Sequence, residues 1–196
     1  MSAPTRWIVT TAARAAYVVA AAGLVAVITI GLFFRIGQPW GTINDLALLV
    51  MTVALGPLML AFYELGGLTP LRLAQAAQAT GWLSIVTWSV TQVLMIVGVV
   101  GFDYGVAATG AFAIWSVASI YIGLWIAGAN LLAGPWVNWL RWLGFVGGLG
   151  WAALGLGMLL GGMNHPLVYA GGIGYTIVLP AWAWLMARHL GALSAA

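Results

Sequence analysis

Apolar residues fill long stretches of this chain, and short segments that hold most of its polar residues separate them. The hydrocarbon core of a membrane is about 30 Å thick, and about 20 residues of α-helix cross it. Six stretches are long enough, and we expect one helix in each: 12–34, 46–63, 81–101, 106–132, 142–161 and 167–187. The pattern therefore predicts one all-α transmembrane domain over 1–196, a polytopic six-helix bundle.

Charged residues make up only 5% of the chain, whereas a soluble domain usually carries about 25%. The six basic residues are all arginine, there are three acidic residues, and the mean hydropathy is +1.08. So few charges do not make a water-exposed surface, which excludes a soluble globular protein. We therefore expect a protein integral to a membrane, and we place it in the bacterial inner (plasma) membrane.

The arginines indicate how the bundle is oriented. If the N-terminus is inside, five of the six lie on the cytoplasmic side: Arg6, Arg14, Arg72, Arg141 and Arg188. Only Arg35 lies on the outer side. Because cytoplasmic loops carry an excess of basic residues, this distribution predicts that both termini are cytoplasmic.

Two prolines, Pro57 and Pro180, interrupt predicted helices. Each removes one intrahelical hydrogen bond, so we expect kinks and freed carbonyls near Val53 and Thr176. Such breaks sometimes form binding sites in membrane proteins, although a tolerated kink is the simpler interpretation. The Thr-Pro pair at 69–70 also predicts that the third helix begins just after it.

A group of polar residues falls at the outer ends of the predicted helices. Asp45 and Asp103 are expected to cap helix N-termini, where backbone amides favour a carboxylate. Arg35 is placed to pair with either of them, and Asn164 and His165 lie at the same level. Together these five residues would form an outer polar cluster at the mouth of a cavity.

Glu64 is predicted at the cytoplasmic end of the second helix, where the helix dipole disfavours a carboxylate. We therefore expect a salt bridge to Arg72 or Arg141, and a proton- or ligand-handling role is the alternative. Gln92 is predicted near the middle of the third helix, where a buried amide needs partners. It would either join two helices or contact a ligand, and Asn130 is expected to be a loop or cap residue.

Small residues recur on the fifth predicted helix, as members of small-xxx-small patterns: Gly144, Gly148, Gly155, Gly157 and Gly161. Such stripes let helix backbones approach closely in lipid. Packing within one bundle is the simpler interpretation, and contact with a second copy or another membrane subunit is the alternative.

Three tryptophans, Trp88, Trp115 and Trp151, are predicted far from either membrane surface. They could line a pocket for a flat or polyene ligand, so a lipid, a quinone and a carotenoid are the candidate non-covalent ligands. Ordinary packing in the core is the alternative.

Several chemistries are excluded by composition. The chain has no cysteine and no lysine, which removes thiolate metal sites, covalent haem attachment and Schiff-base cofactors. His165 and His189 fall at opposite ends of one helix, so they cannot share a haem or a metal ion. No catalytic motif is visible, no charge is predicted near the membrane midplane, and we expect no covalent cofactor, no metal, no enzymatic activity and no nucleic-acid partner.

Two segments, LRWLGFVGGLGW at 140–151 and YTIVLPAWAWLMARHL at 175–190, resemble the end of small bacterial six-helix membrane proteins of unassigned activity. In that pattern a basic-Trp turn leads into a glycine-rich fifth helix, and the last helix carries Pro-x-Trp and ends in basic residues. The resemblance covers the last third of the chain. It implies a bacterial six-helix bundle and supplies no activity.

These observations favour a non-catalytic integral membrane protein, an accessory or scaffold subunit of a larger complex that binds a lipophilic ligand. The expected partners are membrane lipids and either other membrane subunits or a second copy of the chain. The alternative is a small-molecule transporter, or permease, with a polar site near Gln92. That alternative predicts a continuous polar cavity that reaches Gln92.

Overall fold

The computed structural model describes residues 3–66, 71–101, 105–132 and 137–195, and every regular element in these residues is helical. The elements are α1 (Ala3–Ile36), α2 (Trp40–Val53), α3 (Leu55–Gly66), α4 (Leu71–Ile96), α5 (Gly110–Leu132), α6 (Asn138–Gly161), η1 (Gly162–Asn164), α7 (Pro166–Ile173), η2 (Gly174–Val178) and α8 (Leu179–Ala195). They form six stretches long and apolar enough to cross a membrane: Thr5–Ile36, Trp40–Gly66, Arg72–Ile96, Gly110–Leu132, Asn138–Asn164 and Pro166–Ala195. The predicted six-helix architecture is therefore confirmed.

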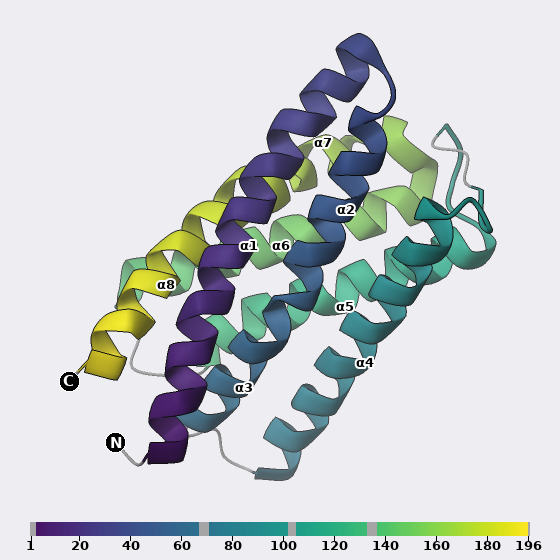
Figure 1. The fold of residues 1–196 in the computed structure, drawn as a ribbon. Coiled ribbons are helices and arrows are strands. Elements are labelled where there is room, and N and C mark those ends of the chain that lie inside the picture. The colour runs from purple at the N-terminus through teal and green to yellow at the C-terminus, as the bar shows by residue number, and fades with distance from the viewer. Residues whose placement is uncertain (1–2, 67–70, 102–104, 133–136, 196) are drawn as a thin grey trace.

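Both chain termini lie at one end of the bundle, which we call the termini end (Figure 1). The opposite end, the distal end, holds the turn from α1 to α2 and the first turns of α5 and α7. The hairpin of α1 and α2 projects beyond the neighbouring helices there (Figure 1). Along its length α1 packs against α8, α2 and α3 through an alanine-rich face.

Two helices have boundaries that differ from the predicted ones, and this changes where two candidate site residues lie within their helices. α2 begins at Trp40 rather than at 46, so Asp45 lies inside the helix. α4 runs from Leu71 to Ile96 rather than over 81–101, so Gln92 lies near its distal end and not at its middle. For α2 the prediction followed the most apolar window, whereas the helical backbone continues through the polar residues that precede it. The start of α4 directly after the Thr-Pro pair is confirmed.

The two interior prolines act where they were expected to. The helix is interrupted at Ala54, between α2 and α3, three positions before Pro57. Before Pro180 the chain forms the π-helical turn η2. There the Thr176 hydroxyl donates to the carbonyl of Gly172 at 2.6 Å. A proline that lacks its N–H and clashes with the preceding turn explains both irregularities.

The glycines of α6 bring three helices together inside the bundle. A Cβ on Gly148 would lie 2.6 Å from the backbone nitrogen of Ala127 in α5, and one on Gly155 would lie 2.5 Å from the carbonyl oxygen of Ser116. Gly157 meets α7 in the same way, with the Val168 nitrogen 2.9 Å away. Backbone contacts this close require glycine. These three glycines therefore contact other helices of the same chain, and they are not available for contact with a partner protein.

Gly144 and Gly161 differ from these three positions. A Cβ on Gly144 would overlap the side chain of Asn130 rather than a backbone. At Gly161 the nearest atoms belong to His165, 3.4 Å away, which is ordinary van der Waals distance. The predicted packing role therefore holds for Gly144 through a side chain, and Gly161 is not tightly packed.

Candidate functional site

The three tryptophans singled out from the sequence meet in the core of the distal half. Trp88 and Trp151 are completely buried, and the Trp88 ring centroid lies 5.4 Å from that of Trp115 and 6.2 Å from that of Trp151. Phe112 and Tyr175 extend the row at each end, with centroids 5.5 Å from Trp115 and 4.6 Å from Trp151. We call these five residues the aromatic cluster. The rings fill the space between the helices themselves, which is the packing alternative rather than an open slot for a quinone or a carotenoid.

Hydrogen bonds connect the aromatic cluster to the polar residues beside it. The Trp88 indole donates to the Ser119 hydroxyl at 2.9 Å, and the Trp115 indole donates to Oε1 of Gln92 at 2.8 Å. Gln92 is only 2% exposed, and its side chain also hydrogen-bonds Asp45. Because an indole N–H is only a donor, the amide oxygen of Gln92 must face Trp115, and its NH₂ group donates to the Asp45 carboxyl.

Asp45 is not a helix cap, which corrects the expectation from the sequence. The N-terminal cap position of α2 is Pro39, and Oε1 of Gln38 accepts from the Thr42 amide at 3.4 Å. Asp45 lies about 9 Å beyond Pro39 along the helix axis, within the apolar span and half-buried. A carboxyl group inside an apolar span is costly and is typical of functional positions.

Two buried donors of the aromatic cluster lack partners. The hydroxyl of Tyr175, a residue only 3% exposed, and the indole nitrogen of the fully buried Trp151 have no hydrogen-bond partner in the described chain. Asp45 acts electrostatically on Tyr175, although α2 and η2 do not pack directly against each other. An unsatisfied buried polar group costs about 1–3 kcal/mol, and such groups are rare in folded proteins. Among the described residues, the distal half thus contains the Asp45 carboxyl and two buried donors without acceptors.

The other members of the expected outer polar cluster do not join Asp45. Arg35 is exposed in the last turn of α1, and Asn164 is exposed in η1. The imidazole of His165 caps α7, where its Nδ1 accepts from the Leu167 amide at 3.3 Å. Among the described side chains, no hydrogen bond or ion pair links these three residues to one another or to Asp45. Asp103 lies outside the described residues.

The predicted cytoplasmic ion pair stays a prediction. Glu64 is exposed near the end of α3, and Arg72 is exposed at the start of α4. Arg141 is partly buried in the first turn of α6. In the described part of the chain no salt bridge joins Glu64 to Arg72.

Asn130 is a connecting residue that the sequence analysis placed wrongly in a loop or cap. It is fully buried in α5, its Nδ2 donates to the Ile126 carbonyl at 2.9 Å, and its Oδ1 accepts from the Trp182 indole at 3.0 Å. The absent side chain of Gly144 makes room for this amide. The signal in the sequence was the glycine itself, which marks the place where another helix comes closest.

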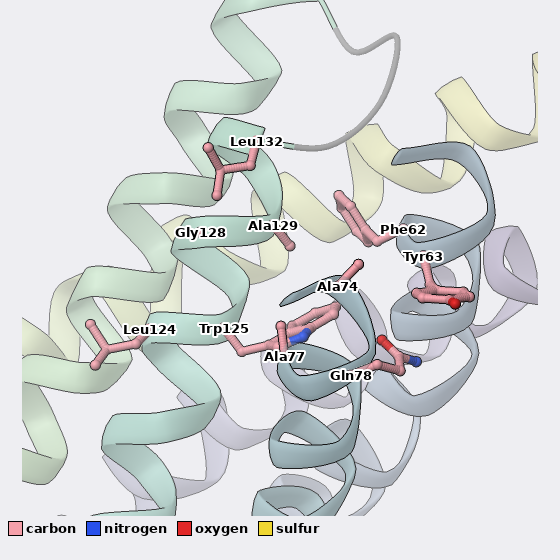
Figure 2. Close-up of a pocket in the computed structure, with 10 residues that line it drawn as sticks. All are labelled: Phe62, Tyr63, Ala74, Ala77, Gln78, Leu124, Trp125, Gly128, Ala129 and Leu132. Atoms are coloured by element: carbon pink, nitrogen blue, oxygen red, sulfur yellow. The ribbon is translucent and has the colours of Figure 1, made fainter. Parts of the chain in front are cut away.

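A pocket lies on the other half of the molecule, between α3, α4 and α5 (Figure 2). Its volume is about 150 Å³, and its walls are mainly apolar: Phe62, Tyr63, Ala74, Ala77, Gln78, Leu124, Trp125, Gly128, Ala129 and Leu132. Leu124 and Leu132 are 50% and 67% exposed, so the pocket opens on the outer surface of the bundle. Phe62 is buried at its inner wall.

The one amide that lines this pocket is occupied by its neighbours. With its amide turned to satisfy both neighbours, Gln78 donates to the Met59 carbonyl at 3.3 Å and accepts from the Trp82 indole at 3.1 Å. The Trp125 ring meets Phe62 edge-on at 5.9 Å between centroids. Such a surface attracts hydrocarbon rather than a polar ligand.

Neither region contains a metal-binding constellation. In the described residues, no group of three or more histidines and carboxylates could hold a metal ion. Comparisons with known proteins assign no family: no protein-family model, no curated protein and no solved structure matches the chain.

Proposed function

We propose that this protein is a non-catalytic integral membrane protein that holds part of a lipophilic molecule in the pocket between α3, α4 and α5. The observation that carries the proposal is the pocket itself, an apolar recess whose rim is exposed on the outer surface of a bundle long enough to span a membrane. Lipid chains are the most abundant molecules that such a rim would meet.

The size of the pocket limits which ligands it could hold. A cavity of about 150 Å³ accommodates a group of roughly benzene size, whereas sites that enclose a whole drug-sized ligand occupy about 300–1,000 Å³. The pocket therefore takes the end of a hydrocarbon chain or one ring of a larger molecule. A lipid acyl chain fits this description better than a complete quinone or carotenoid.

The same proposal includes an accessory or scaffold role in the bacterial inner membrane. The chain has almost no charge with which to perform chemistry, and its apolar outer faces suit contact with lipids or other membrane subunits. Since α5 and α7 already cover the close-packed glycines of α6, a partner would use another helix face. α4 presents one, with exposed Leu83, Val86 and Val90.

Filling the pocket tests the proposal. A Cβ on Gly128 would have no atom within 4 Å, so Gly128→Leu adds a side chain to the pocket without displacing backbone. Gly31→Leu is the matched control, because Gly31 has the same free space on exposed α1. A phospholipid with a diazirine at the end of one acyl chain is photolysed with the purified protein in nanodiscs, and the labelled peptides are identified.

We expect labelling of the α4 and α5 peptides that line the pocket in the wild type and in Gly31→Leu, and a large loss of this labelling in Gly128→Leu. Equal labelling of those peptides in all three proteins would contradict the proposal. Thermal melting of each variant in detergent separates a filled pocket from a misfolded protein.

The transporter alternative is favoured by one contact, the hydrogen bond between Gln92 and Asp45. It also predicts a polar cavity that reaches Gln92, but that side chain is 2% exposed and bonded to Trp115. A transporter would therefore need a second conformation in which the aromatic cluster separates. Accessibility of a cysteine introduced at Thr91 to a water-soluble maleimide would detect such a state, and protection under all conditions argues against it.

A further inference from the structure

Asp45 has no cationic partner among the described side chains around it. α2 packs against α1, α3 and α4. Most ionisable groups on those helices lie toward the termini end or near mid-helix: Arg6, Arg14, Tyr17, Tyr63, Glu64 and Arg72. Arg35 is the exception, and it is exposed at the end of α1 without a contact to Asp45. From η2, only Tyr175 interacts with the carboxyl.

A carboxylate that lies in an apolar span and has no cationic partner needs a bound proton or cation to neutralise its charge. An isolated buried charge costs far more than a hydrogen-bonded neutral group, and such residues commonly take up a proton or bind a cation. The Gln92 NH₂ group donates to Asp45 in either state, because the Trp115 indole fixes the orientation of the amide.

The available oxygen atoms favour the proton over a metal ion. Hard cations such as calcium and magnesium take about six or more oxygen ligands. Here the amide oxygen of Gln92 already accepts from Trp115, which leaves the Asp45 carboxyl and the Tyr175 hydroxyl. A proton needs one oxygen atom.

We propose that Asp45 is a proton-binding site within the apolar span, with Gln92 as its permanent hydrogen-bond donor and Tyr175 as the donor that responds to its charge. In the structure the buried Tyr175 hydroxyl has no acceptor. A neutral carboxylic acid still has an oxygen that accepts, but it is a weaker acceptor than a carboxylate and attracts this hydroxyl less. When Asp45 releases its proton to water at the distal end, the carboxylate becomes the acceptor that this hydroxyl lacks.

The position of Tyr175 indicates which helices would move if its hydroxyl turned toward the ionised Asp45. Tyr175 lies in the π-helical turn η2, which joins α7 to α8 just before Pro180. π-Helical turns are often found at functional sites, and the backbone is already irregular there. A shift of Tyr175 toward Asp45 would therefore change the angle between α7 and α8. This inference is independent of the lipid pocket, which is built from other residues.

The experiment uses a hydrophobic carbodiimide on the whole protein in liposomes. Dicyclohexylcarbodiimide enters the membrane and reacts with protonated carboxyl groups: the acid adds across a C=N bond, its proton moves to nitrogen, and the acyl group then migrates to give a stable N-acylurea. Labelling is measured by peptide mass spectrometry between about pH 5 and about pH 9. Peptide mapping distinguishes Asp45 from Glu64 and Asp103.

We expect the Asp45 peptide to be labelled, and the labelling to fall as the pH rises. Asp45→Asn should abolish it, and Glu64→Gln, which changes an exposed carboxyl at the other end, should leave it unchanged. No labelling of Asp45 at any pH, or labelling that does not depend on pH, would overturn the proposal. These readouts come from the wild type, so they remain valid if Asp45→Asn does not fold.

A second pair of variants tests the role of Tyr175. Tyr175→Phe removes the hydroxyl that would stabilise the ionised carboxylate, so the midpoint of labelling should move to higher pH. Tyr169→Phe is the matched control, because Tyr169 is 64% exposed on neighbouring α7 and should leave the midpoint unchanged. If the two variants give the same midpoint as the wild type, Tyr175 is not the responding group.

Discussion

The two halves of the bundle differ in how completely side chains fill the space between the helices. In the distal half, tryptophan rings from α4, α5 and α6 fill the interior, and the indoles of Trp88 and Trp115 each have a hydrogen-bond acceptor. Toward the termini end, the walls formed by α3, α4 and α5 leave a recess of about 150 Å³ that opens outward (Figure 2). Both regions contain tryptophan and one glutamine, yet only the first is closed.

The difference between the halves shows what aromatic residues would contribute to a bundle that spans a membrane. Lipid is as apolar as a leucine core, so burial alone does not drive helices together, and close packing and interhelical hydrogen bonds do. Trp88 makes both kinds of contact, through two ring neighbours and the Ser119 hydroxyl. Trp125 makes ring contact with Phe62 but stands beside empty space.

The largest expected effect follows from removing one ring in each half. Trp88→Ala should lower the free energy of unfolding by about 3–5 kcal/mol, because it leaves a cavity where the surrounding rings have no freedom to collapse. Trp125→Ala should cost less, because it enlarges a recess that is already open. Thermal melting in detergent checks the order, and equal losses would mean that the two halves are equally well packed.

The two halves also differ in how much of their structure could be predicted from the sequence. The number of helices, the irregularities at Pro57 and Pro180 and the glycine packing of α6 follow from local rules about length, proline and small residues. The burial of Trp88 and Trp115 against each other was one of two stated alternatives. Local rules say which residues a helix contains, but not which of its faces meets another helix.

The candidate site was therefore predicted only in part. Asp45 and Gln92 were both singled out, but Asp45 was grouped with Arg35 and His165 because they share a predicted level in the membrane. The structure groups Asp45 with Gln92 and Tyr175 instead. Two helix boundaries account for the error: α2 begins six residues earlier than predicted, at Trp40, and α4 ends five residues earlier, at Ile96. Asn130 was missed because its partner Trp182 lies on a helix remote in sequence.

A smaller effect is expected from the two glutamines. Gln92→Leu leaves the Trp115 indole without its acceptor and Asp45 without its donor, so it should cost about 1–3 kcal/mol. Gln78→Leu should cost less, because Gln78 is partly exposed at the rim of the recess. The difference is measured by thermal melting, and near-ultraviolet circular dichroism should change more in Gln92→Leu, where a tryptophan loses its fixed position. If Gln78→Leu is the more damaging variant, the polar network does not hold the distal half closed.

The smallest expected effect has the opposite sign, because one substitution at the recess should stabilise the protein. Alanine has a higher helix propensity than glycine by up to about 1 kcal/mol, provided that its methyl group has space. Gly128 has that space and Gly148 does not, since a Cβ there would lie 2.6 Å from a backbone nitrogen. Gly128→Ala should therefore raise the melting temperature slightly, as should the control Gly31→Ala, whereas Gly148→Ala should lower it. Should Gly128→Ala destabilise the protein while Gly31→Ala stabilises it, the recess is filled in the working protein, and its occupant then contributes to the stability of the bundle.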